Sequence, residues 1–165
     1  MSTGKAVFDL GLAHVGESYV AGIQVPMNDT NWQGPWDCAE LASWLVYQTS
    51  GLLYGTRTRE DNRFADAFTG YWAAQAQWDN ATVDVEDAAQ ILGAFILRKP
   101  RPGKRGHIVI SHGEGGTLEA HSRKRGVVLE SLAGRCFDFG ILVPGIAYAG
   151  VTRVCEELEM LRDAS

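Results

Sequence analysis

The chain has 165 residues, of which 45% are hydrophobic and 21% charged, and its formal net charge is -5. This length suits one domain, and the balance of apolar and charged residues excludes wholesale disorder. The negative charge argues against a nucleic-acid partner, because such proteins gather Lys and Arg on one face. One basic cluster around Pro100 and Pro102 is interpreted as a solvated loop; it comprises Arg98, Lys99, Arg101, Lys104 and Arg105.

The sequence contains no apparent membrane span or export signal. The longest apolar run, residues 91–97, is far shorter than the roughly 20 residues of a spanning helix. Residues 1–16 carry Asp9 and His14 where a signal peptide needs a continuous apolar stretch. We therefore expect synthesis in the cytoplasm and no membrane partner. Any action on a cell wall would need phage lysis or a dedicated secretion system, with a delivery or immunity partner of unknown kind.

The first half of the chain has mainly helical character. Apolar spacing predicts a helix over residues 6–14, and Gly, Pro and Asn residues predict a loop over 19–34. A second helix is expected from Cys38, with Asp37 as its N-cap. In the same helix Glu40 would complete a capping-box pair, and Gly51 would supply the left-handed residue that ends it. Further along, residues 57–90 favour one or two helices, from the spacing of Phe64, Ala67, Phe68, Tyr71 and Trp72.

The second half of the chain is predicted to form short strands. They are expected over 92–97, 107–111, 117–122 and 127–131, with 141–143 adding an edge. Helices followed by an antiparallel meander define an α+β fold. We expect a single catalytic domain over residues 1–165, with a core of about 6–148 and an amphipathic C-terminal helix within 149–165.

Cys38 is the first candidate for chemistry. The three cysteines, Cys38, Cys136 and Cys155, read as free thiols, because an odd, small number does not form a disulfide framework. At a helix N-terminus, unsatisfied N–H groups favour the thiolate and lower the cysteine pKa. The alternative is that Cys38 is a small buried hydrophobe, as most free cysteines are.

Two histidines strengthen the case for Cys38. If the turn between the strands is symmetric about Glu114, His107 lies directly across from His121, and Val109 across from Glu119. Directly opposed residues on antiparallel strands have β-carbons roughly 4.5–5.5 Å apart. One imidazole could then accept the thiol proton while the second holds its orientation. The alternative is that the polar face of this hairpin simply faces water and that neither histidine has a catalytic role.

Two other interpretations concern the same residues. Cys38, His107 and His121 include the donor types that bind zinc, although no closely spaced ligand pair is present. Trp32 and Trp36 flank the proposed nucleophile in the loop and could form a wall of a cleft.

Four sequence segments together resemble the NlpC-type (NlpC/p-sixty) cell-wall cysteine peptidases, a branch of the papain-like fold. They are YVAG, WDCAELASWLVYQTSG, GHIVI and GGTLEAHS, and the resemblance spans about residues 6–145. It implies that Cys38 is the nucleophile, His107 the general base and His121 the group that orients His107. The same resemblance places Tyr19 near the oxyanion and assigns Asp37 to the free amine of the substrate. No metal or organic cofactor is implied.

The resemblance implies cleavage of a peptide or amide bond in peptidoglycan stem peptides through an acyl-enzyme, often after D-glutamate. Ala39 and Glu40 replace the Ser and Gly of the family pattern, and Gly93-Ala94 replaces its Gly-Asp. These departures leave open a deamidase, transferase or acyl hydrolase with the same triad and another substrate. A non-catalytic wall-binding module is a further alternative.

Overall fold

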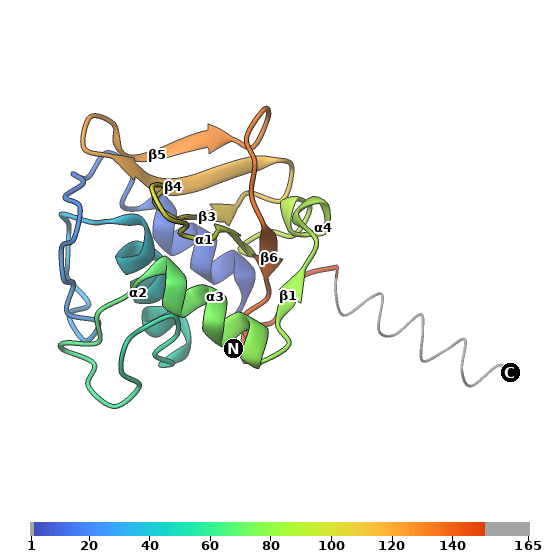
Figure 1. Ribbon diagram of the computed structural model, residues 1–165. Helices are drawn as coiled ribbons and strands as arrows, with labels where there is room; N and C mark the ends of the chain where they lie inside the picture. The colour runs from blue at the N-terminus through green and yellow to red at the C-terminus, as the bar shows by residue number, and fades with distance from the viewer. Residues whose placement is uncertain (1, 151–165) are drawn as a thin grey trace, which may run out of the picture.

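The computed structural model describes residues 2–150, in which the helices and strands surround one hydrophobic core (Figure 1). The elements are α1 (Gly4–Leu12), α2 (Cys38–Ser50), α3 (Thr69–Trp78), β1 (Thr82–Val83), α4 (Val85–Ala89), β2 (Phe95–Arg98), β3 (His107–Ser111), β4 (Gly116–Ser122), β5 (Gly126–Ser131) and β6 (Phe139–Ile141). The fold is α+β, as predicted. The helix expected at the C-terminus lies, from residue 151 onward, outside the described residues.

The sheet contains the predicted antiparallel meander from β2 to β5. Its full strand order is β1-β6-β2-β3-β4-β5, and all of these pairings are antiparallel. The sequence predicts the last strand at an edge, but β6 crosses back and pairs with both β1 and β2. The outer strand β1 was not predicted, because a strand of two residues is too short to show periodicity.

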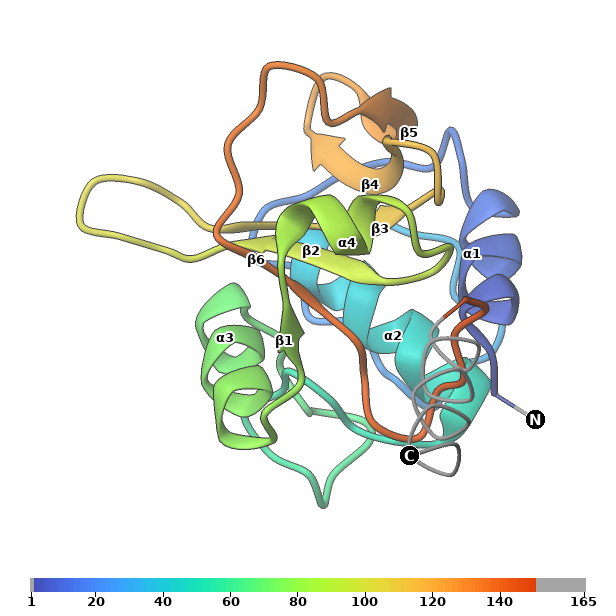
Figure 2. The same ribbon diagram turned by 90° about the vertical axis from the view of Figure 1, so that its right-hand side faces the viewer.

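The helices are placed so that the first residue of α2, Cys38, lies against the sheet. Helices α1 and α2 contact each other and β4, and α2 also contacts β3, while α3 packs on β2 (Figures 1 and 2). Leu41 and Leu45 of α2 and Ile108 and Ile110 of β3 are fully buried. Their burial fixes the start of α2 against the start of β3.

Helix α2 has the ends that the sequence predicts. The Asp37 side chain accepts a hydrogen bond from the Glu40 N–H at 2.8 Å, and Gly51 closes the helix with φ 75°. Such a left-handed residue favours glycine, which lacks the Cβ that would clash.

Two sequence predictions are wrong in detail. Residues 57–90 contain two helices, α3 and α4, as predicted, but the helical spacing does not extend back to Phe64: α3 begins only at Thr69, and Phe64 is 59% exposed. Strand β2 begins at Phe95 instead of residue 92, because Gly93 has φ 82° and lies against the backbone of α1. A Cβ on Gly93 would lie 2.0 Å from the Gly4 carbonyl oxygen, so only glycine permits this approach.

Candidate active site

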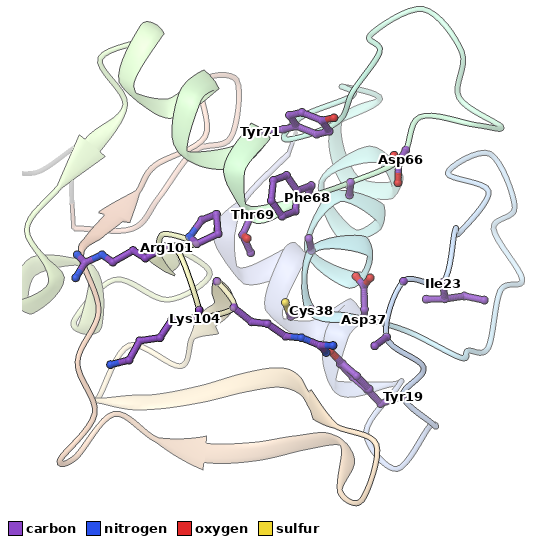
Figure 3. Close-up of a pocket in the computed structure, with 18 residues that line it drawn as sticks. Tyr19, Ile23, Asp37, Cys38, Asp66, Phe68, Thr69, Tyr71, Arg101 and Lys104 are labelled. Carbon is purple, nitrogen blue, oxygen red and sulfur yellow. The ribbon is translucent and has the colours of Figure 1, made fainter.

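Cys38 is the first residue of α2, and its thiol lies in a cleft beside the start of β3 (Figure 3). The backbone N–H groups of Ile108, Ala39 and Cys38 itself act to lower the pKa of Cys38 and so favour the thiolate. Burial, with the negative charge of Asp37 added, outweighs them and raises the pKa of Cys38 to about 12. The predicted lowering of this pKa is therefore wrong, because desolvation of the anion exceeds the stabilisation by the helix N-terminus. The resting thiol is neutral and needs a base.

His107, the first residue of β3, is the candidate base. It is 8% exposed, and its Nε2 lies 2.9 Å from Oε1 of Glu119 on β4. Within residues 2–150, Nδ1 of His107 makes no hydrogen bond, and neither does Cys38 with the imidazole. Ile108, which follows His107 directly, has a backbone N–H that acts on the pKa of Cys38, so Cys38 and His107 belong to the same corner of the fold. Nδ1 is the nitrogen left to accept a proton.

Glu119 is held in place by three side chains. Its oxygens accept hydrogen bonds from Arg135 at 3.0 and 2.6 Å and from the Thr117 hydroxyl, besides the contact with His107. The carboxylate is 0% exposed, and burial alone would raise its pKa. The hydrogen bonds from His107, Arg135 and Thr117 outweigh burial and bring the pKa of Glu119 to about 2. A permanent anion therefore lies beside the imidazole.

The structure does not give His121 the orienting role that the sequence predicted. The predicted register is confirmed by the pairs Ile110 with Leu118 and Ser111 with Thr117. The ring centroids of His107 and His121 are nevertheless 6.3 Å apart, and His121 hydrogen-bonds to Ser122 at 3.0 Å. Strand β4 has an irregularity between Ala120 and Ser122 in its pairing with β5, and such bulges re-aim side chains. Glu119 takes the place predicted for His121.

Two neighbouring hollows contain the two halves of the site. A hollow of about 780 Å³ opens at Cys38 and Asp37. A second, of about 690 Å³, contains His107 and His121, and Tyr19 and Gly106 line both. Burial, with the charges of Cys38 and Asp37 added, raises the pKa of Tyr19 to about 12, so its hydroxyl remains a hydrogen-bond donor. Tyr19 and Asp37 both line the hollow at Cys38, and their contacts with substrate stay a prediction.

Trp36 does not line this cleft, so its predicted substrate contact is wrong. It is 0% exposed, packs edge-on against His14 and Trp44, and donates its indole N–H to Glu17 at 2.8 Å. A large ring with a satisfied N–H is stable in an aromatic cluster, and Trp36 serves the core.

Glu40 also departs from its predicted role. Its carboxylate does not complete a capping box but accepts hydrogen bonds from the N–H groups of Val25 at 3.3 Å and Ala67 at 3.0 Å. It is 0% exposed, so the carboxylate gained relative to the family pattern lies behind the cleft wall. Burial, with the charge of Asp37 added, raises its pKa to about 8. Glu40 ties two loops together behind Cys38.

Glu119, Arg135 and Asp66 were missed as site residues. The sequence did contain a signal for Glu119, since this residue shares a strand face with His121 and a carboxylate is a favourable partner for an imidazolium. Arg135 lies in the loop after β5 and Asp66 in the segment before α3, and no local pattern brings either to the site. Across residues 2–150, no group of three or more His, Cys, Asp and Glu side chains is arranged to hold a metal ion. In the same range no helix is long and apolar enough to cross a membrane.

Cys38 at the start of α2 and His107 at the start of β3 thus belong to one α+β domain. No family model and no curated protein sequence matches the chain. Among solved structures, the NlpC/p60 domain of the peptidoglycan hydrolase SagA has a TM-score of 0.61 and 17% identity, over 86% of this chain and 99% of that chain. The P60 domain of an M. avium subspecies paratuberculosis antigen has a TM-score of 0.59 and 18% identity, and the match covers 84% of this chain and 92% of that chain.

Longer proteins share the same fold. NlpC1 from Trichomonas vaginalis has a TM-score of 0.57 at 16% identity, and the match covers 84% of this chain but 42% of that one. The chain therefore has the fold of NlpC/p60 domains, as the sequence resemblance predicted.

Proposed function

We propose that the protein is a cysteine hydrolase that cleaves a peptide or amide bond in peptidoglycan stem peptides. The observation that carries the proposal is the combination of Cys38 at the start of α2 with the buried His107–Glu119 pair. Two proteins of similar structure, SagA and RipB from Mycobacterium tuberculosis, are peptidoglycan hydrolases, which supports the choice of substrate. The chain covers nearly all of the SagA domain, so the whole catalytic unit is compared.

The proposed mechanism begins with proton transfer, because the Cys38 thiol is neutral at rest. Nδ1 of His107 takes the thiol proton as the sulfur attacks the carbonyl carbon, and the carbonyl π pair moves to oxygen. The first-turn N–H groups of α2 and the Tyr19 hydroxyl donate hydrogen bonds to this oxyanion. Glu119 stabilises the imidazolium and fixes its tautomer, as the acid of a triad does.

Collapse of the intermediate expels the leaving amine. The imidazolium gives its proton to the amine nitrogen, and a thioester remains on Cys38. A water molecule, deprotonated by His107, then attacks the thioester, which releases the carboxylic acid and restores the thiol. A transferase would use an amine or alcohol in place of this water.

The test is digestion of purified peptidoglycan, with the soluble fragments identified by mass spectrometry. Wild type should release fragments whose masses identify the bond, and Cys38→Ala should release none. Cys136→Ala, at an exposed cysteine, is the matched control and should behave as wild type. Acylated acceptors in place of hydrolysis fragments would indicate a transferase. If wild type and Cys38→Ala behave identically, the hydrolase proposal is wrong.

A further inference from the structure

A single carboxylate joins the two chain segments that carry Tyr19 and Cys38. Glu17 precedes Tyr19 by two residues, and Trp36 stands at the same interval before the nucleophile. Oε1 of Glu17 accepts a hydrogen bond from the Trp36 indole N–H at 2.8 Å. The Glu17 side chain therefore links the two segments close to the hollow that Tyr19 and Cys38 both line (Figure 3).

His14 holds the Glu17 carboxylate in this position. Nδ1 of His14 lies 2.7 Å from the same Oε1 atom, and a carboxylate oxygen only accepts, so His14 donates from Nδ1. His14 is 9% exposed and packs edge-on against Trp36 and Trp44, with ring centroids 5.4 and 5.0 Å away. One oxygen thus receives two hydrogen bonds from rings that the aromatic cluster fixes in place.

Backbone hydrogen bonds continue the link up to Tyr19 itself. The Trp36 N–H donates to the Ser18 carbonyl at 2.9 Å, and the Val20 N–H donates to the Trp36 carbonyl at 2.9 Å. These two bonds make a parallel bridge between Tyr19 and Trp36. Tyr19 is thereby held in a fixed register against the segment that leads into α2.

The other side of the Tyr19 segment is attached to β5, at the edge of the sheet. The Gly16 N–H donates to the Val127 carbonyl, and the Val127 N–H donates to the Glu17 carbonyl, both at 2.9 Å. Gly126 approaches so closely that a Cβ on it would lie 2.3 Å from the Glu17 carbonyl oxygen. The backbone of Glu17 is therefore fixed by β5, while its side chain holds Trp36.

Stabilisation of an oxyanion requires donors that are in position before the reaction, and a small misplacement far from the reacting atoms lowers the rate. Tyr19 is such a donor in the proposed mechanism. Burial and the negative charges of Cys38 and Asp37 raise the pKa of its hydroxyl to about 12, which marks its closeness to the thiol. We propose that Glu17 is a positioning residue that keeps the Tyr19 hydroxyl beside Cys38. The inference rests on the proposed function and adds to it a residue that stands apart from the reacting atoms.

The first test is a double-mutant cycle with Tyr19→Phe, in steady-state hydrolysis of the tripeptide L-alanyl-γ-D-glutamyl-L-lysine. Glu17→Ala should lower kcat by about tenfold and change KM by less than about twofold, because Tyr19 acts on the transition state. In the Tyr19→Phe background the same substitution should lower kcat by less than about twofold further. Equal losses in both backgrounds, or a rise in KM with unchanged kcat, would overturn the positioning role, since a general loss of structure acts on both backgrounds alike.

Two conservative variants separate the reach of the Glu17 side chain from its charge. Glu17→Gln keeps the length and an acceptor oxygen for both N–H groups, so it should retain at least about half of the wild-type kcat. Glu17→Asp keeps the charge but is one methylene shorter, so it should lose nearly as much as Glu17→Ala. The reverse order would contradict positioning. Glu86→Ala, at an exposed carboxylate of α4, is the control and should behave as wild type, and thermal unfolding verifies that every variant folds.

A second measurement reads the position of Tyr19 without turnover. Protein labelled with fluorotyrosine gives a fluorine NMR resonance for Tyr19, assigned by its absence from Tyr19→Phe. Cys38→Ala should shift this resonance in the wild-type and Glu17→Gln backgrounds, and much less in Glu17→Ala. An equal shift in all three backgrounds would overturn the inference. If the resonance responds as predicted while wild type leaves both the tripeptide and peptidoglycan intact, the hydrolase proposal fails and the positioning of Tyr19 stands.

Discussion

Glu40 and Glu119 are both fully buried carboxyl groups within the same site, yet their pKa values move in opposite directions. Glu40 is bonded only by backbone N–H groups and lies near Asp37, and burial raises its pKa to about 8. Glu119 is buried as well, but His107 and Arg135 outweigh the burial and bring its pKa to about 2. Partners, more than burial, decide whether a buried carboxyl group is charged.

The difference between the two pKa values gives Glu40 and Glu119 different roles. A neutral Glu40 joins the loops at Val25 and Ala67, which border the cleft, and so acts as a structural link. A charged Glu119 stabilises the imidazolium that forms when His107 takes a proton. The comparison predicts that substitutions at Glu119 mainly affect activity and that substitutions at Glu40 mainly affect stability.

The largest effect is expected for Glu119→Gln. The amide cannot neutralise an imidazolium and can favour the wrong tautomer of His107, so kcat should fall by about 10²–10⁴-fold. Steady-state hydrolysis of a stem peptide measures this fall, and binding of the same peptide should change little. A variant with unchanged kcat would contradict the role given to Glu119.

A smaller effect is expected for Arg135→Gln, which removes two hydrogen bonds from a buried carboxylate. The free energy of unfolding should fall by about 1.5–3 kcal/mol near neutral pH. The lowered pKa of Glu119 contributes stability that is present above its unfolded value of 4.5 and lost as pH falls toward about 2. Acid unfolding should therefore begin at a higher pH in the variant. Denaturant titrations between pH 2 and 5 test this, and identical acid curves would refute it.

Glu40→Gln should show the opposite pH dependence. The raised pKa of Glu40 means that its stability is present in full below the unfolded value of 4.5 and lost as pH rises through about 8. Glutamine does not titrate and has one acceptor oxygen for two N–H donors, so the variant should lose about 1–3 kcal/mol at pH 5. The deficit should shrink toward pH 9. Denaturant unfolding at pH 5 and pH 9 measures this stability deficit, and a deficit that grows with pH would count against a neutral Glu40.

The smallest effect is expected for His121→Asn. His121 hydrogen-bonds to its neighbour Ser122 and lies near the exposed Arg125, while Nε2 of His107 bonds to Glu119. Substitution should change the activation free energy by no more than about 0.5 kcal/mol, roughly twofold in rate. A loss of kcat as large as that of Glu119→Gln would restore the orienting role that the sequence predicted.

The sequence predicted the parts of this site that local patterns control. Asp37, Cys38 and Gly51 mark a helix whose ends depend on neighbouring residues, and the β3–β4 register follows from a short symmetric turn. His107 is placed by the same hairpin. These predictions held because each depends on interactions between residues close in the chain.

The choice between Glu119 and His121 could not be made in this way. Sequence alternation puts both residues on the same face of the predicted strand, whereas the irregularity near His121 and the approach of Arg135 depend on tertiary packing. The direction of the Cys38 pKa failed for a related reason, since the helix N-terminus is visible in sequence but the desolvation of the thiol is not.

The most direct test of the central claim is to trap the acyl-enzyme. Wild type would be mixed with a stem peptide, quenched in acid within milliseconds to seconds, and digested for peptide mapping by mass spectrometry. We predict that the fragment containing Cys38 gains the mass of the acyl portion of the peptide, and that this adduct disappears in Cys38→Ala and forms slowly in Glu119→Gln. Product formation with no adduct at Cys38, or an adduct at another residue, would contradict the account.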